Sequence, residues 1–330
     1  GDAETVADAV RRLGVPVWLA GGARGLLGRQ DALQLRHKRG KALAEADLVI
    51  LAGVPADFRL GYGRSIGKHA RIMAVGVDKR ALVKNRVPSL PIPADPGRFL
   101  VRLAKRCEAG ASANDRAPWL AMLRERDIRR DREVVELAAV EAPPINPLAA
   151  CLAIEAAMAD DATIVVDGGD FVATAAYTVR PRRALGWLDP GVFGTLGVGA
   201  GFAIAAAVER PDSEVWLLYG DGAAGFSLIE FDTCVRHGLA VIAVIGNDAS
   251  WTQIARDQVT FLGDDVGTVL ARTDYDQVAA GLGAVGLIAR SIEEVPAVLA
   301  EAKRVAAAGR PVVVNLHIGR TAFRDGSLSM

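Results

Sequence analysis

The sequence is poor in the residues that build disulfide frameworks, zinc sites and base-stacking surfaces. Its 330 residues include three cysteines and four histidines, and aromatic residues make up 5%. The cysteines (Cys107, Cys151 and Cys234) are odd in number and form no CxxC pair, so we expect reduced thiols and a cytoplasmic location. The scarcity of aromatic side chains argues against a surface that stacks nucleic-acid bases.

The sequence also lacks an excess of charge and a long hydrophobic run. Lys and Arg together number 39, as do Asp and Glu, so neither nucleic acid nor an anionic membrane is an expected partner. The longest apolar stretch, 192–208, is rich in Gly and Ala and falls short of the roughly 20 residues of a membrane-spanning helix. The first four residues show no basic start or apolar run of a signal peptide.

Strand-like and helix-like segments alternate along both halves of the chain. In the first half, strands are expected at 15–20, 47–52 and 71–77 and helices at 4–13 and 35–46. In the second half, strands are expected at 162–167, 214–219, 240–245 and 311–316 and helices at 198–209, 226–237, 274–282 and 292–308. Runs such as DLVILA are apolar throughout, which is typical of parallel strands buried on both faces.

This alternation predicts an α/β fold with two doubly wound parallel-sheet domains. The length of 330 residues fits two domains. Between them lie a stretch rich in Gly, Ala, Ser and Asn and a highly charged helix, which we read as a linker and a connecting helix. The predicted boundaries are 1–106 for the first domain, 107–144 for the connection and 145–330 for the second domain.

The strongest chemical signal lies where two consecutive strands end. Gly220-Asp221-Gly222 follows the strand 214–219, with a helix expected from about Gly225, and Asn247 follows the strand 240–245. Consecutive strands are usually neighbours, so Asp221 and Asn247 should lie at one edge of the sheet. A carboxylate, an amide oxygen and a nearby backbone carbonyl would supply three ligands to Mg²⁺, which often joins a carboxylate to phosphates.

A dinucleotide-binding motif is the alternative interpretation of the same residues. Gly220, Gly222 and Gly225 match GxGxxG after a strand, and Asp248 could contact a ribose. However, Asp221 places a negative charge where the pyrophosphate should approach, and like charges about 4 Å apart repel by about 4 kcal/mol at an effective dielectric constant near 20. A divalent cation would remove this conflict, so an NAD-binding Rossmann protein stays as the rival.

GDG followed by 24 residues and Asn resembles the thiamine diphosphate (ThDP) motif, although one asparagine of the usual pair is replaced by Gly246. Over nearly its whole length the chain resembles the acetolactate synthase superfamily, most closely its 2-hydroxyacyl-CoA lyase-like members. The matching stretches are GGARGLLGR (21–29), VVDGGDFVATAA (165–176), WLDPGVFGTLGVGAGFA (187–203), GNDASWTQI (246–254) and VNLHIGRTAFRDGS (314–327).

The resemblance implies a role for each matched site residue. The metal ligands would be Asp221, Asn247 and the backbone oxygen of Ala249. Gly194 would accept a hydrogen bond from the cofactor's amino group, and Leu196 would hold the cofactor bent. Other cofactor-binding residues would be Gly169, Asp170, Phe171, Gly220, Gly222, Ala223, Ala224 and Asn247, and possible substrate-facing residues are Trp251 and Gln253.

The first domain resembles the middle domain of the same superfamily, which holds FAD or the ADP part of CoA in some relatives. Arg24, Asp57, Phe58 and Asp78 match nucleotide-facing positions. An aspartate at a strand end is more commonly a turn or cap residue, so FAD or ADP/CoA is the weaker expectation.

The resemblance further implies an Mg²⁺- and ThDP-dependent lyase or ligase of carbon–carbon bonds. The small-molecule substrate would be a 2-hydroxyacyl-CoA, or 2-oxo acids if the chain is an acetolactate synthase. The superfamily's activating glutamate lies in a pyrimidine domain that this sequence does not match, so we expect a fragment that is inactive alone. That domain would come from a missing segment or another chain, in a homodimer or homotetramer, and a non-catalytic ThDP-binding module is a further alternative.

Overall fold

Two units make up the chain in the computed structural model, which describes residues 2–107 and 116–325. The first unit comprises Gly1–Leu19 and Gln30–Asp131, and the second comprises Ala20–Arg29 and Arg132–Met330. The division therefore falls within helix α5 (Ala117–Ala138) and assigns a short early segment to the second unit. The predicted domain boundaries stay a prediction, and residues 108–115 of the predicted linker lie outside the described residues.

A three-stranded parallel sheet forms the centre of the first unit. The strands are β1 (Leu48–Ala52), β2 (Arg71–Gly76) and β3 (Leu90–Pro93), in that spatial order. The helices are α1 (Ala3–Leu13), α2 (Arg39–Glu45), α3 (Lys79–Leu82) and α4 (Pro96–Cys107), with a 3₁₀ segment at Phe58–Gly63. Apolar side chains of β1 and β2, including Val49 and Ile72, form its core.

Two expectations for the first unit need correction, and one strand was not predicted. The strand predicted at 15–20 is wrong, because this segment makes only one isolated bridge, between Val17 and Gln34. The helix predicted at 35–46 is confined to α2, because Lys38 just before it adopts a left-handed backbone with φ of 51°. Strand β3 went unpredicted, since prolines occupy two of its four residues and proline disfavours strands.

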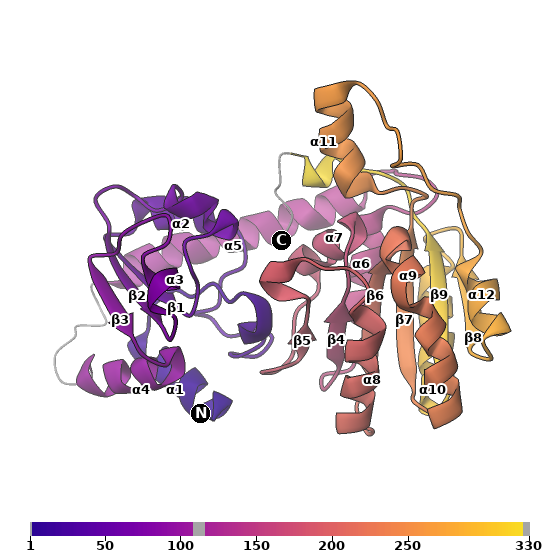
Figure 1. The fold of residues 1–330 in the computed structure, drawn as a ribbon, viewed down its shortest axis with the longest axis horizontal. Coiled ribbons are helices and arrows are strands. Elements are labelled where there is room, and N and C mark those ends of the chain that lie inside the picture. The colour runs from indigo at the N-terminus through magenta and orange to yellow at the C-terminus, as the bar shows by residue number, and fades with distance from the viewer. Residues whose placement is uncertain (1, 108–115, 326–330) are drawn as a thin grey trace. The chain divides into compact units, whose positions relative to one another are not determined.

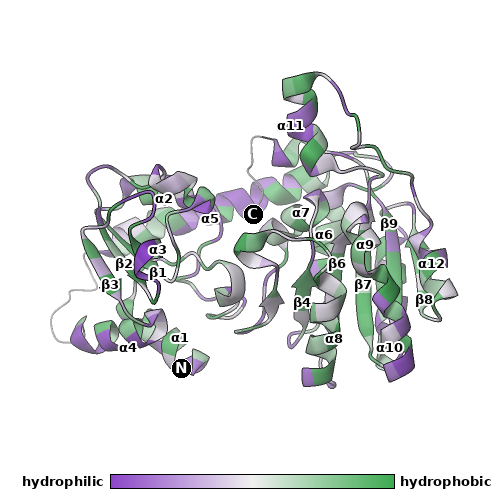
Figure 2. Cartoon of the chain, in the orientation of Figure 1, coloured by the Kyte–Doolittle hydropathy of each residue, from purple (hydrophilic) through white to green (hydrophobic). Residues whose placement is uncertain are grey.

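A six-stranded sheet, parallel throughout, forms the second unit (Figure 1). Its strands are β4 (Thr163–Val166), β5 (Trp187–Leu188), β6 (Val215–Gly220), β7 (Val241–Asn247), β8 (Val285–Ala289) and β9 (Val312–His317). The spatial order is β5-β4-β6-β7-β9-β8. Figure 2 shows β7 and β9 in the green of hydrophobic residues, and every residue of β6 and β7 is buried.

Helices cover both faces of this sheet, so the predicted doubly wound α/β architecture is confirmed. One face packs on α6 (Pro147–Ala157), α7 (Asp170–Thr178) and α13 (Val295–Ala307). The other packs on α8 (Gly199–Glu209), α9 (Asp221–Ser227), α10 (Phe231–His237) and α12 (Tyr275–Gly281). Along β6, Trp216 and Leu218 face the first layer, whereas Leu217 and Tyr219 face the second.

The site-bearing helix begins earlier than predicted. Helix α9 starts on Asp221 itself instead of near Gly225, which places the acidic side chain in the first turn. Strands β5 and β8 went unpredicted, because β5 has only two residues and β8 contains a glycine in a partly exposed segment. In the described ranges, 2–107 and 116–325, no helix combines the length and apolar character needed to cross a membrane.

Candidate cofactor and metal site

The order of the strands places a topological switch point between the ends of β4 and β6. From β4 the chain moves outward to β5, then returns past β4 to form β6 on its other side. In open parallel sheets, ligands bind at this kind of switch point. Here the two glycine turns touch: Gly220 donates its N–H to the Gly168 carbonyl at 3.0 Å, and a Cβ on Gly169 would lie 3.2 Å from the Gly220 Cα. Gly169 also has φ of 114°, which only glycine adopts readily.

Asp221 is a buried carboxyl group without a cationic partner among the described residues. Its Oδ1 accepts from Gly222 N–H at 2.8 Å and its Oδ2 from Ser250 N–H at 3.1 Å, and the residue is 3% exposed. Burial, followed by the negative charge of Asp248, raises the pKa of Asp221 to about 6. Two acidic side chains held close in a buried place favour uptake of a cation.

Asn247, on the neighbouring strand, presents an unused hydrogen-bond acceptor. Strands β6 and β7 pair so that Gly220 lies opposite Gly246, which sets the residues that follow them side by side. Asn247 is fully buried, and its amide nitrogen donates to Thr273 O at 3.0 Å and Asn315 Oδ1 at 3.1 Å. Its Oδ1 has no hydrogen-bond partner. A buried acceptor left unpaired is costly, so this oxygen marks a place for a ligand.

Ala249 belongs to the same loop and has a strained backbone. Its φ is 57°, a left-handed value that alanine rarely adopts and that is often associated with functional loops. Its carbonyl accepts from Leu270 N–H at 3.0 Å, which leaves a second lone pair. One carboxylate, one amide oxygen and one carbonyl fit Mg²⁺, which prefers oxygen ligands. Groups of three or more His, Cys, Asp or Glu placed to hold a metal are absent from the described residues.

Asp167 is a site residue that the sequence interpretation missed. It is 1% exposed, and its carboxylate accepts from the N–H groups of Gly197 and Gly199, the latter at 2.8 Å. These bonds hold the loop 194–199 against the turn after β4, where a Cβ on Gly168 would lie 1.9 Å from Leu196 Cδ2. The sequence does contain a signal that could have identified Asp167, because this acidic residue lies between a buried strand and two glycines.

Several predicted cofactor-binding residues offer only their backbone. The Phe171 ring is buried against β7, since a Cβ on Gly246 would lie 2.2 Å from it. The side chains of Ala223 and Ala224 lie in the core. Gly194, by contrast, is exposed, with φ of 57°. The roles predicted for these four residues stay predictions.

The predicted substrate-facing residues lie at the start of α11 (Thr252–Leu262). The Trp251 ring covers Gly222, where a Cβ would come within 2.5 Å of it. Gln253 is half-buried in the first helical turn. Arg256 of the same helix donates to Asp170 Oδ1 at 2.6 Å, so Asp170 is held in an ion pair beside the turn after β4.

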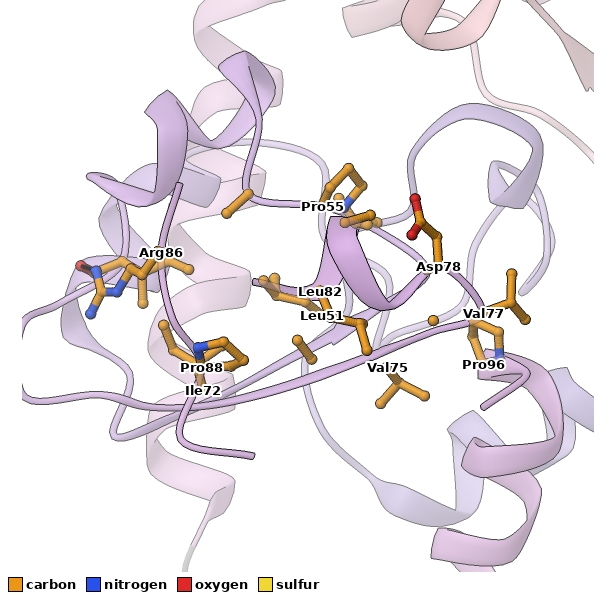
Figure 3. A pocket seen from close by; sticks show the side chains of 17 residues that line it. Leu51, Pro55, Ile72, Val75, Val77, Asp78, Leu82, Arg86, Pro88 and Pro96 are labelled. Atoms are coloured by element: carbon orange, nitrogen blue, oxygen red, sulfur yellow. Dashed lines mark hydrogen bonds between the residues drawn. The ribbon is translucent and has the colours of Figure 1, made fainter. Parts of the chain in front are cut away.

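The first unit has a separate pocket of about 180 Å³ at the carboxyl ends of β1 and β2 (Figure 3). Its lining is mainly apolar, with Asp78 and Arg86 on opposite sides. Arg86 already donates to three carbonyls, those of residues 63, 66 and 67, and Asp78 caps α3 by accepting from Arg80 N–H. This pocket therefore suits an uncharged group better than phosphates.

The other predicted nucleotide-facing residues do not line this pocket. Asp57 forms an ion pair with Arg59 at 2.7 Å, and Phe58 begins the 3₁₀ segment. Arg24 belongs to the second unit, where its guanidinium lies 4.7 Å from the centre of the Trp187 ring. The central-domain match reported below includes this residue, so the nucleotide-facing role of Arg24 stays a prediction.

Comparisons with known proteins identify the family and the domains of the chain. The model of the thiamine pyrophosphate enzyme C-terminal TPP binding domain matches residues 167–316, and the central-domain model of these enzymes matches residues 1–103. The 2-hydroxyacyl-CoA lyase 2 of Bos taurus is 49% identical over 329 residues, or 98% of this chain and 52% of the relative. A probable acetolactate synthase of Mycobacterium bovis is 36% identical over 305 residues, or 92% of this chain and 54% of the relative.

A solved structure supports the fold. The thiamine diphosphate-dependent 4-hydroxybenzoylformate decarboxylase of Rhodococcus jostii RHA1 has a TM-score of 0.74 and 21% identity, covering 97% of this chain and 59% of that chain. The chain spans about half the length of the curated relatives it matches. The matched domain contains both Asp221 and Asn247, which sets aside the dinucleotide-binding interpretation of GxGxxG. The chain belongs to the thiamine pyrophosphate enzymes, and it carries their central domain and their C-terminal TPP-binding domain.

Proposed function

We propose that the second unit binds the diphosphate of ThDP together with Mg²⁺ at the ends of β6 and β7, as part of a carbon–carbon lyase. The observation that carries this proposal is the unpaired, fully buried Oδ1 of Asn247, on a residue that follows Gly246, the sheet partner of the Gly220 that precedes Asp221. A divalent cation satisfies the acceptor and neutralises the acid. It also lets a diphosphate approach residues that would otherwise repel it.

The residues around the metal would then orient the cofactor. Bound ThDP supplies the electron sink that allows a bond next to a carbonyl carbon to break or form. Asp221, Asn247 and the Ala249 carbonyl would hold the cation. The glycine turns, which carry no side chains, would allow close approach of the diphosphate. Leu196, held by Asp167 through its loop, would support the bent cofactor.

We further propose that the substrate is a 2-hydroxyacyl-CoA. The support is the higher identity, 49% against 36%, to a protein titled 2-hydroxyacyl-CoA lyase 2 than to a probable acetolactate synthase. Acetolactate synthase chemistry on 2-oxo acids is the second candidate. The apolar pocket of the first unit is proposed to take the nucleoside part of CoA or FAD, since its only cationic lining residue, Arg86, is already bound to carbonyls.

Turnover is proposed to require a pyrimidine-binding domain, from a further segment or another chain, in a homodimer or homotetramer. This chain would contribute the diphosphate half of the site, and no residue in it is assigned the activating role of the glutamate. The three cysteines are free, which fits the proposed cytoplasmic location.

Calorimetry of ThDP binding at several Mg²⁺ concentrations tests the proposal. We expect heat of binding that requires the metal, with Asp221→Ala abolishing it because the cation loses its charged ligand. The matched control is Asp232→Ala, which removes an exposed carboxylate of α10 in the same unit. If the wild-type chain, alone and mixed with a relative's pyrimidine-binding domain, takes up no ThDP with Mg²⁺, the proposal is wrong.

An activity assay separates the remaining alternatives. The chain combined with a pyrimidine-binding domain is offered a 2-hydroxyacyl-CoA and, separately, pyruvate. Aldehyde formation from the first supports the lyase, whereas acetolactate formation from the second supports the synthase. Metal-dependent cofactor binding without either product would identify a non-catalytic ThDP-binding module.

A further inference from the structure

A buried chain of amides fixes which atom of Asn247 faces the proposed metal. Both N–H groups of its amide are used, by Thr273 O and by Asn315 Oδ1. An amide has one oxygen and one nitrogen end, so this arrangement turns Oδ1 the other way. If the Asn247 amide were rotated by half a turn, its oxygen would face two other hydrogen-bond acceptors, Thr273 O and Asn315 Oδ1.

The orientation of the Asn315 side-chain amide is also fixed by acceptors on one side. It is fully buried on β9, and its Nδ2 donates to Thr273 O at 3.2 Å and to Asp276 Oδ1 at 3.1 Å. A carboxylate and a carbonyl only accept hydrogen bonds, so they require the nitrogen of Asn315. Its oxygen is thereby presented to Asn247.

The fold brings Asp276 to this position through a close contact between α12 and β8. A Cβ on Gly286 would lie 2.0 Å from the Asp276 carbonyl oxygen, so only glycine lets the first turn of α12 approach so closely. Asp276 is 5% exposed, and its other oxygen accepts from Gln277 Nε2 at 3.1 Å. The helix therefore holds an acceptor-only group against the strand that carries Asn315.

We propose that Asn315 and Asp276 are positioning residues for the metal: they set the direction of the Asn247 amide so that its Oδ1 is ready to coordinate Mg²⁺. This inference rests on the proposed function, because it concerns the same metal. The Asp276 carboxylate fixes the orientation of the Asn315 side-chain amide, which in turn fixes the orientation of the Asn247 side-chain amide. Such outer partners of a ligand typically change metal affinity by about 10- to 100-fold when they are replaced.

The test measures ThDP affinity of the full chain as a function of Mg²⁺ concentration for wild type and Asn315→Leu. Leucine has nearly the same volume but cannot accept from Asn247. We expect the Mg²⁺ concentration for half-maximal ThDP binding to rise by about tenfold or more. ThDP affinity at saturating Mg²⁺ should stay near that of wild type. A merely structural role would instead lower ThDP affinity at every Mg²⁺ concentration.

A control and a second variant make the result decisive. Thr178→Val removes a buried hydroxyl from α7 of the same unit, outside this network, and should leave the Mg²⁺ dependence unchanged. If Asn315→Leu does not fold, Asp276→Asn decides, because its amide no longer forces the direction of Asn315. A rise of about threefold or more in the Mg²⁺ requirement supports the inference, and a smaller change overturns it.

Failure of this inference differs from failure of the proposed function. If wild-type protein takes up no ThDP with Mg²⁺, the metal site itself is wrong. If wild type binds both but folded Asn315→Leu has the wild-type Mg²⁺ requirement, or loses ThDP affinity equally at all Mg²⁺ concentrations, only the positioning role is wrong.

Discussion

The raised pKa of Asp221 predicts that protons compete with the metal near neutral pH. With a pKa of about 6, the carboxyl group is ionised to about 90% at pH 7 and to about 10% at pH 5. Since the proposed Mg²⁺ ligand is the carboxylate, the Mg²⁺ affinity should fall about tenfold between these two pH values. At its ordinary pKa of 3.8, Asp221 would still be about 94% ionised at pH 5, and the affinity would hardly change.

The measurement is the Mg²⁺ concentration for half-maximal ThDP binding between pH 5 and pH 8. The diphosphate of the cofactor also takes up protons near pH 6, so a matched variant is needed. Asp248→Asn removes the charge that helps to raise the pKa of Asp221, so its profile should shift to lower pH while the cofactor's contribution stays the same. Identical profiles for the two proteins, or a wild-type Mg²⁺ requirement that is flat over this range, would refute the reasoning.

The same titration affects the stability of the metal-free protein in the opposite direction. The pKa of Asp221 in the folded chain lies above its ordinary value of 3.8, so its contribution to stability is fully present below about pH 4 and is lost as the pH rises through about 6. A difference of about two pKa units corresponds to about 3 kcal/mol. Mg²⁺ should therefore raise the melting temperature more at pH 7 than at pH 5, and an equal rise at both would contradict this argument.

Two further substitutions test the packing of the site. Gly222→Ala should destabilise the protein by about 1–3 kcal/mol in a denaturant titration, because the added Cβ would meet the Trp251 ring at 2.5 Å. The control is Gly225→Ala in the same helix, where an added Cβ would meet no atom within 4 Å; this substitution should be neutral or stabilising. Asp167→Asn should lower the free energy of unfolding by about 1–3 kcal/mol, because N–H groups of the loop 194–199 lose an acceptor. The same variant should bind ThDP more weakly at every Mg²⁺ concentration. Unchanged cofactor affinity in the folded variant would argue against a positioning role for this loop.

The elements that could be predicted from the sequence are those whose physical signal is local. Strands β6 and β7 are apolar at nearly every position, which is what a strand covered on both faces requires. Strand β5 pairs over only two residues and β3 contains two prolines, so their strand conformation depends on neighbours that no local pattern reveals. The early start of α9 could not be predicted for the same reason. Its GDG sequence has low helix propensity, so the helical conformation there depends on the surrounding sheet.

The same distinction applies to the site. Asp221 and Asn247 end two consecutive strands, so chain order alone was enough to place them together. Asn315 lies 68 residues beyond Asn247, and β9 enters the sheet between β7 and β8 although β8 comes earlier in the chain. The contact between Asn315 and Asn247 therefore depends on the order of the strands in the sheet. The orientation of the Asn315 amide depends in addition on Asp276, an acceptor from α12. The proposed ligand types could be inferred from the sequence, whereas the groups proposed to orient them could be identified only from the packed structure.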